Sequence, residues 1–344
     1  MTRSNHNSPN SEVARNPVMS ETGFSPRTDL AIEAHELARG GKSSLAGVEE
    51  SSVDYDDFHV TRVNVKNASG ALAIGKPVGT YITVDAPGIR RRDPELQDTV
   101  AMQLAKEFAT LIDVPENASV LIVGLGNSHV TPDALGPLVV ERVFVTRHLF
   151  QYMPEAIGEG YRTVSAVAPG VLGITGIETS EVVKGIVEHV KPDLVIAVDA
   201  LASRSLSRVN ATIQVANTGI QPGAGVGNKR KALDEESLGV PVIAVGVPTV
   251  VDASTIANDS IERLLNQLKS SVPENGASQI FDQFSAQEKW QMIHEVLEPL
   301  GDNLVVTPKE IDEFIEDIAH VVAKGLNLAL HPGMTPDDAD AVTH

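Results

Sequence analysis

Two aspartates, Asp133 and Asp199, carry the clearest chemical signal in this chain of 344 residues. Asp133 follows the apolar run 119–123 after a short loop, and Asp199 directly closes the apolar run 194–198. Both runs are typical of buried parallel strands, whose carboxyl ends face the crevice where open α/β sheets bind ligands. Two carboxylates in one crevice could share a proton and activate a water molecule, or they could bind a divalent metal.

Each aspartate also has a structural explanation. Asp133 belongs to the first turn of an expected helix, where the helix dipole stabilises a carboxylate. Asp199 could bond to a neighbouring loop, although aspartate is disfavoured in strands and is costly to bury unpaired. Because both residues stand at the ends of strands, we interpret them as a functional pair.

Other catalytic and nucleotide-binding signatures are broken or missing. Residues 124–129 (GLGNSH) hold two glycines of a dinucleotide fingerprint, but His129 stands in the place of the third. Residues 41–44 (GKSS) have Glu36 where a phosphate-binding loop needs its first glycine. The chain has no cysteine, no G-x-S-x-G elbow and no H-E-x-x-H motif. Thiolate, serine-hydrolase and zincin chemistry therefore lose support.

A non-enzymatic alternative rests on a second glycine-rich segment. Residues 223–227 are followed by a basic stretch, 229–231, and could bind an anion together with residues 124–127. The ordinary interpretation is a flexible glycine loop with a solvated basic end, and we prefer it.

Composition narrows the class of protein. Aliphatic residues supply nearly all of the 42% hydrophobic content, since aromatics make up only 4%. This bias suits parallel strands covered by helices on both faces. A net charge of -19 argues against non-specific binding to nucleic acid or anionic lipid. The N-terminal residues are polar and lack the apolar stretch of a secretory signal, so we expect a cytoplasmic protein.

Strands and helices are expected to alternate along the chain. The patterns predict strands over 61–65, 71–74, 80–84, 119–123, 164–167, 194–198, 211–215 and 240–247. They predict a helix within 24–39 and helices over 94–111, 178–190, 254–268 and 307–330, with a polar loop over 41–57. The sequence therefore predicts a single α/β domain with loop insertions, built on a doubly wound, mostly parallel sheet flanked by helices. The first 23 residues lack a periodic apolar pattern and are expected to be mobile.

Over most of its length the chain resembles the germination protease, or spore endopeptidase, family. The resemblance is carried by residues 27–36 (RTDLAIEAHE), 120–137 (VLIVGLGNSHVTPDALGP), 175–205 (from TGIETS to DALASRS), 220–230 (IQPGAGVGNKR) and 239–253 (GVPVIAVGVPTVVDA). It implies an endopeptidase that degrades small acid-soluble spore proteins during germination, in the cytoplasm of the spore core. It also implies a homotetramer with no direct nucleic-acid or membrane partner.

The resemblance further implies a zymogen that cuts itself between Asp29 and Leu30. Residues 1–29 would then be a propeptide and residues 30–344 the peptidase domain. The proposed catalytic residues of the family fall on Asp133 and Asp199, one acting as general base and the other, protonated, polarising the scissile carbonyl. The implied fold is similar to that of the hydrogenase-maturation peptidases, in which acidic residues at strand ends contact nickel. This chain offers no clear histidine counterpart for such a site, so no metal or cofactor is expected, and a metal-dependent peptidase remains the alternative.

Overall fold

The architecture is built on one long mixed sheet. The computed structural model describes residues 28–40, 44–222, 230–271 and 304–343, together with residues 288, 292, 295 and 296. The described strands follow the order β1-β2-β3-β7-β8-β6-β4-β5, with β9 paired to β8. They are β1 (Val48–Asp54), β2 (His59–Val65), β3 (Gly79–Asp85), β4 (Ser119–Gly124), β5 (Thr163–Val167), β6 (Leu194–Ser203), β7 (Thr212–Ala216), β8 (Val242–Asp252) and β9 (Val305–Val306).

Parallel and antiparallel pairing occupy different halves of the sheet. Strands β8, β6, β4 and β5 pair in parallel, whereas β1, β2, β3, β7 and β8 pair in antiparallel fashion. The predicted α/β class is confirmed, and the expected parallel arrangement holds for the half that contains β4 and β6. The other half differs for a simple reason at β1 and β2, which are separated only by residues 55–58. A parallel pair needs a crossover of about a dozen residues or more, so this pair can only be antiparallel.

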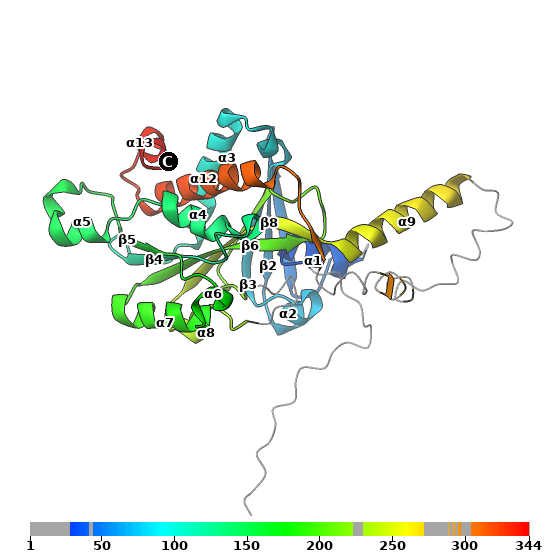
Figure 1. Ribbon diagram of the computed structural model, residues 1–344, viewed down its shortest axis with the longest axis horizontal. Coiled ribbons are helices and arrows are strands. Elements are labelled where there is room, and N and C mark those ends of the chain that lie inside the picture. Colours follow the sequence, from blue (N-terminus) through cyan, green and yellow to red (C-terminus); the bar gives the residue numbers. More distant parts are fainter. Residues whose placement is uncertain are drawn as a thin grey trace, which may run out of the picture.

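Helices cover both faces of the sheet (Figure 1). One face carries α3 (Pro94–Leu111), α4 (Leu135–Arg142) and α12 (Ile311–Leu330), and the opposite face carries α1 (Ala31–Arg39), α2 (Ala68–Ile74), α7 (Thr179–Val190) and α8 (Glu235–Leu238). The remaining helices are α5 (Arg147–Tyr152), α6 (Leu172–Thr175), α9 (Ala253–Ser271) and α13 (Pro336–Val342), with 3₁₀ turns η1 (Pro87–Arg91), η2 (Thr131–Asp133) and η3 (Pro154–Ala156). The described residues thus form one domain with a helical layer on each side of the sheet.

Successive side chains of the central strands pack on alternate faces of the sheet, and both faces are buried. In β6, Ile196 and Val198 pack into the cluster beneath α3, α4 and α12. Val195 and Ala197 pack into the cluster on the α7 side. Both faces are therefore apolar, which explains why the strand reads as one continuous hydrophobic run. The same alternation places Asp199 on the α7 side of the sheet.

Two predicted elements are wrong. The segment 71–74 is not a strand but the end of α2, because Asn67 caps the first turn by accepting the Gly70 amide at 3.0 Å and Gly75 ends the helix with φ 67°. The polar loop expected over 41–57 contains β1, all but the first of whose residues are exposed. An edge strand of this kind has no buried face, so it lacks the apolar alternation by which strands are predicted.

Some expectations fall on residues that the structure does not describe. Residues 1–27 of the expected propeptide lie outside the described residues, and so does the glycine-rich segment 223–227. In the part of the chain that is described, no helix is both long enough and apolar enough to cross a membrane.

Candidate active site

Asp133 and Asp199 line the same cavity. Asp133 follows the end of β4, whereas Asp199 lies within β6, which continues to Ser203 instead of ending at the predicted residue 198. The cavity has a volume of about 360 Å³, and Asp29, Arg230 and Thr249 also contribute to its wall. Asp199 is buried within β6, with 5% of its surface exposed, and Asp133 closes the 3₁₀ turn η2. The two aspartates predicted from the sequence are thus brought together by the fold.

Close backbone packing fixes the position of Asp133. Gly126 follows β4 with φ +111°, and a Cβ atom at this position would overlap the carbonyl oxygen of Asp133. That oxygen accepts the amide of Asn127 at 3.0 Å. The hydroxyl of Thr249, a residue of β8, donates to the carbonyl of Pro132 in the same turn at 2.6 Å. The η2 turn is therefore held against the end of β4 by main-chain contacts that only a glycine at position 126 allows.

Asp199 is positioned by the sheet itself. It pairs in parallel register with Gly246 of β8, and its neighbour Val198 accepts the amide of Leu125 at 2.8 Å. The Asp199 carboxylate accepts the amide of Ala200 at 3.0 Å. A side chain on a central strand has little freedom to move, so this carboxylate is fixed by the same register that buries the core.

Burial raises the pKa of both carboxyls, and neighbouring carboxylates raise that of Asp199 further. For Asp199 the pKa lies well above its ordinary value, mainly because of desolvation and further because of the charges of Asp133 and Asp29, while the Ala200 amide and Arg230 act in the opposite direction. Desolvation also raises the pKa of Asp133, against the lowering effects of the Asn127 backbone amide and Arg230. The cavity therefore holds a carboxyl group that keeps its proton to unusually high pH beside a second that titrates at lower pH.

The chain's own residue Asp29 reaches into this cavity along the edge of β6. Strand β4 ends at Gly124, which pairs with Val198, whereas β6 continues to Ser203. Asp29 occupies the edge that β4 leaves open: its amide donates to the Ala202 carbonyl at 2.9 Å, and its carboxylate accepts the Ala202 amide at 2.8 Å. Residue 29 thus extends the sheet at this edge by one backbone hydrogen bond, and its carboxylate supplies the second acceptor.

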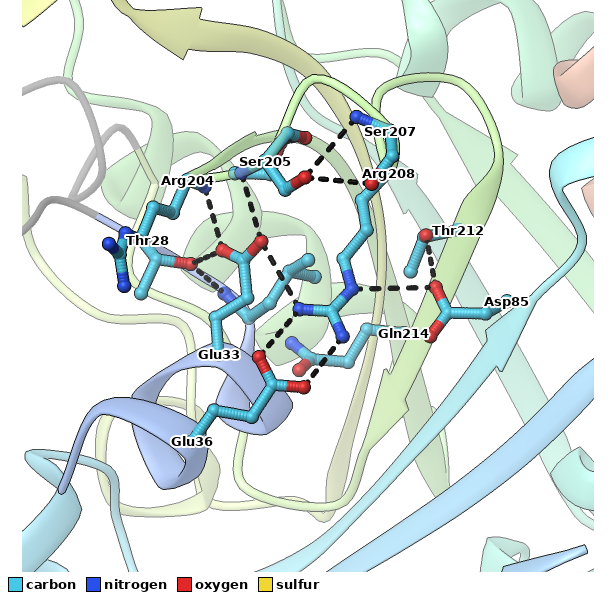
Figure 2. Close-up of polar contacts among 12 residues, drawn as sticks. Thr28, Glu33, Glu36, Asp85, Arg204, Ser205, Ser207, Arg208, Thr212 and Gln214 are labelled. Carbon is cyan, nitrogen blue, oxygen red and sulfur yellow. Dashed lines mark hydrogen bonds and ion pairs between the residues drawn. The ribbon is translucent and has the colours of Figure 1, made fainter. Parts of the chain in front are cut away.

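The residues that follow Asp29 are anchored by a polar network (Figure 2). The Glu33 carboxylate, which is 2% exposed, accepts the amides of Arg204 and Ser205 at 2.7 and 3.1 Å and is bound by the Thr28 hydroxyl. The Arg208 guanidinium pairs with three carboxylates, those of Glu33, Glu36 and Asp85, at 3.3, 2.8 and 3.7 Å. Helix α1 is therefore fixed to the segment that follows β6, directly after the predicted cleavage site.

Three residues around the cavity were not found by reasoning from the sequence. Arg230 lines the cavity, although the sequence favoured a solvated basic stretch over an anion-binding one for residues 229–231. Lys76 and Gln214 contact the backbone around Asp29. A single lysine in a turn and a single glutamine in a strand carry no periodic or motif signal, so nothing local could have revealed them. His129 is exposed and does not line the cavity.

The donor set does not fit the nickel site suggested by the hydrogenase-maturation peptidases. Among the residues that the structure describes, no group of three or more histidine, cysteine, aspartate or glutamate side chains could hold a metal ion. The lining of the cavity, as far as it is described, contains aspartates but no histidine. Nickel and comparable metals favour imidazole among their ligands, so the described lining of this cavity does not fit such a metal.

Comparison with known proteins gives a consistent result. A family model described as germination protease matches residues 27–283 and 274–343. A germination protease of Caldanaerobacter subterraneus subsp. tengcongensis is 51% identical over 92% of this chain and 98% of its own length. Germination proteases of Bacillus cereus and Bacillus mycoides are 48% and 46% identical, each over 93% of this chain and 98% of its own length.

Proposed function

The chain belongs to the germination protease family and is a peptidase, and from this premise we propose that it degrades small acid-soluble spore proteins during germination after cutting itself from a zymogen. The observation that carries the proposal is the single cavity lined by Asp29, Asp133 and Asp199. It combines two carboxylates suited to peptide hydrolysis with the residue that precedes the expected cut.

The difference between the two catalytic carboxyls supports a division of labour. Asp199 has its pKa raised well above the ordinary value, so it is the partner that carries the proton and acts as general acid on the peptide group. The pKa of Asp133 is raised less, because a backbone amide and Arg230 oppose the effect of desolvation. Asp133 is therefore the general base that takes a proton from the attacking water. The proposed mechanism is therefore of the aspartic type.

Self-processing would divide the chain into a propeptide, residues 1–29, and a peptidase domain, residues 30–344. Asp29 lies in the cavity, and Leu30, with none of its surface exposed, begins the segment that packs beneath β6. The network around Glu33 and Arg208 would keep α1 in place after the cut. An acidic residue before the bond and an apolar one after it would also be the pattern read in spore-protein substrates.

Incubation of the full chain at mildly acidic pH tests this proposal directly. Sequencing of the new N-terminus should give Leu30, and the product should digest small acid-soluble spore proteins. Asp133→Asn and Asp199→Asn should abolish both reactions, whereas Asp113→Asn, at an exposed position, should leave them unchanged. An Asp199→Asn protein that still matures and digests substrate would refute the assignment. Loss of activity in chelator, restored by one added metal, would select the metal-dependent alternative.

We also propose that the protein is a homotetramer that works in the cytoplasm of the spore core. Helix α9 extends away from the sheet, and its Ile261 and Leu264 are exposed at 40% and 56% (Figure 1). Apolar side chains on a projecting helix are suited to bury against a second copy. Sedimentation equilibrium gives the mass directly, and a monomer at working concentrations would contradict this part of the proposal.

A further inference from the structure

We propose that Lys76 and Gln214 form the carbonyl-binding part of the peptide site, which holds the carbonyl oxygen of the residue before the cut and stabilises the negative charge that develops there. The inference rests on the proposed cut between Asp29 and Leu30. It assigns to two residues outside the aspartate pair a direct contact with the reacting group.

The contacts converge on the main chain at the expected scissile bond. The Lys76 ammonium lies 2.9 Å from the carbonyl oxygen of Asp29 and 3.2 Å from that of Thr28. The Gln214 amide nitrogen lies 3.4 Å from the same Asp29 oxygen, and its side-chain oxygen accepts the Ala31 amide at 2.7 Å. All four contacts are to backbone atoms, so any extended peptide placed in this position could make them.

Asp29, the residue before the proposed scissile bond, lies between two cavities. Asp29 lines the cavity of Asp133 and Asp199, and it also lines a second cavity of about 390 Å³. Lys76 and Gln214 form part of the wall of this second cavity. The peptide group therefore has carboxyl groups on one side and an ammonium and an amide on the other, which is the polarity that hydrolysis needs.

The environment of Lys76 strengthens its hydrogen bonds. Desolvation lowers the pKa of Lys76, and the charges of Asp29 and Glu33 oppose that change. Tyr81 and Asp234 also line its cavity. An ammonium that has lost much of its water forms stronger hydrogen bonds with a carbonyl oxygen than one in bulk solvent does.

The proposed step balances in atoms and charge. The attacking water adds to the carbonyl carbon of Asp29 and gives a proton to Asp133. The carbonyl electrons move onto the oxygen held by Lys76 and Gln214. When the tetrahedral intermediate collapses, the bond to the Leu30 nitrogen breaks, and that nitrogen takes the proton of Asp199. The products are a new carboxyl group at residue 29 and a new amino group at residue 30.

A purely structural role for Lys76 predicts something different. The segment is also held by two hydrogen bonds between Asp29 and Ala202, one made by the Asp29 amide and one by its carboxylate, and neither involves Lys76. If Lys76 only clamped the segment, the polarisation of the Asp29 carbonyl would contribute little to catalysis. Loss of Lys76 would then leave the rate of cutting nearly unchanged. The carbonyl itself is therefore the correct place to measure.

The sequence offers an internal control for that measurement. It contains two Asp–Leu pairs, Asp29–Leu30 and Asp193–Leu194. In the Asp199→Asn chain, which should stay intact, carbonyl-¹³C aspartate combined with ¹⁵N leucine gives one NMR correlation for each pair. Lys76→Met should shift the Asp29 carbonyl signal upfield, toward that of an unpolarised carbonyl, and leave the Asp193 signal in place. An Asp29 signal that Lys76→Met does not move would overturn the inference.

The same labels follow the reaction in the chain with both aspartates present. Cutting removes the Leu30 correlation and keeps that of Leu194. Lys76→Met should slow this loss by about 10²- to 10³-fold, as removal of one oxyanion donor does in other hydrolases. Lys76→Arg, which retains the charge, should restore part of the rate. Lys66→Met is a matched control, because the Lys66 ammonium forms an exposed ion pair with Glu49 at 3.0 Å.

The outcomes separate the two proposals. A Lys76→Met chain that is folded by its unfolding midpoint and cuts at the unsubstituted rate would overturn the role of Lys76, whatever its carbonyl signal. If the unsubstituted chain itself never loses the Leu30 correlation while the Asp29 carbonyl still responds to Lys76, the proposed cut fails and the carbonyl contact stands. Partial rescue by arginine together with the carbonyl shift would support both.

Discussion

Replacement of Gly126 by alanine is expected to damage stability and activity together, because this residue sets the position of Asp133. Gly126 has φ +111°, a conformation that an alanine rarely adopts. The added Cβ would overlap the Asp133 carbonyl oxygen and lie 3.3 Å from the Asp133 Cγ atom. Relief of this overlap must move the η2 turn away from the end of β4, and the Asp133 carboxylate moves with it.

The structure sets the size of the effect. The unfavourable backbone conformation costs about 1–2 kcal/mol, and insertion of a methyl group into a packed contact costs about 1–3 kcal/mol. The free energy of unfolding should therefore fall by about 2–5 kcal/mol. A displacement of Asp133 by about 1 Å should lower the rate of self-cleavage by about 10²-fold.

Two measurements and one control test the reasoning. Urea unfolding gives the stability, and the appearance of the Leu30 N-terminus gives the rate, at a temperature where the variant remains folded. Gly185→Ala is the matched control, since nothing lies within 4 Å of a Cβ atom at this position in α7. It should gain about 0.5–1 kcal/mol and keep full activity. A Gly126→Ala protein with unchanged stability and rate would show that η2 is not held as described.

For three further perturbations, the direction of the change in stability follows from the burial of the groups involved. Arg208→Met should lower the free energy of unfolding by about 3–5 kcal/mol, because it removes the guanidinium that pairs with the buried Glu33 carboxylate. Arg39→Met is the control, since it removes an exposed ion pair and should cost about 0–1 kcal/mol. Desolvation is the main cause that lowers the pKa of His331 to about 4. The free energy of unfolding should therefore fall by about 3 kcal/mol as the pH falls from 6.5 through 4, because the unfolded state binds this proton first. In the His331→Gln protein, the free energy of unfolding measured in urea should change less over this pH range. Asp199→Asn should match the unsubstituted protein at pH below 3.8 and exceed its stability increasingly as the pH rises, because the unfolded state loses the Asp199 proton before the folded state does; a constant difference across pH would contradict the raised pKa.

The central strands and the longest helices were predictable because their signals are local. The predicted helix 94–111 coincides with α3 (Pro94–Leu111), whose first turn has Asp93 as its cap and proline at the first position. The predicted strands 119–123 and 194–198 are the cores of β4 and β6. In each case the residues that decide the element lie within it, so one stretch of sequence contains all that is needed.

The elements and residues that escaped prediction depend on distant partners. Strand β1 exists because β2 offers an edge, and its own residues are mostly exposed. Gln214 lies 185 positions away from Asp29, and Lys76 lies 47 positions away, yet both meet its carbonyl oxygen. No periodicity links residues so far apart. The sequence could therefore indicate the two carboxylates, but not the groups that face them across the peptide.

The register of β6 decides whether the site can form at all. Side chains along this strand alternate between the α12 face, where Val198 packs, and the α7 face, where Val195 and Ala197 pack. Asp199 shares the second face, on the side where the N-terminal segment and Leu201 pack together. If this carboxylate moved by one position along the strand, it would point into the apolar layer beneath α12, away from the charges of Asp133 and Asp29. The alternation that buries the core therefore also assembles the carboxyl pair, and the strand can shift its register only by losing both.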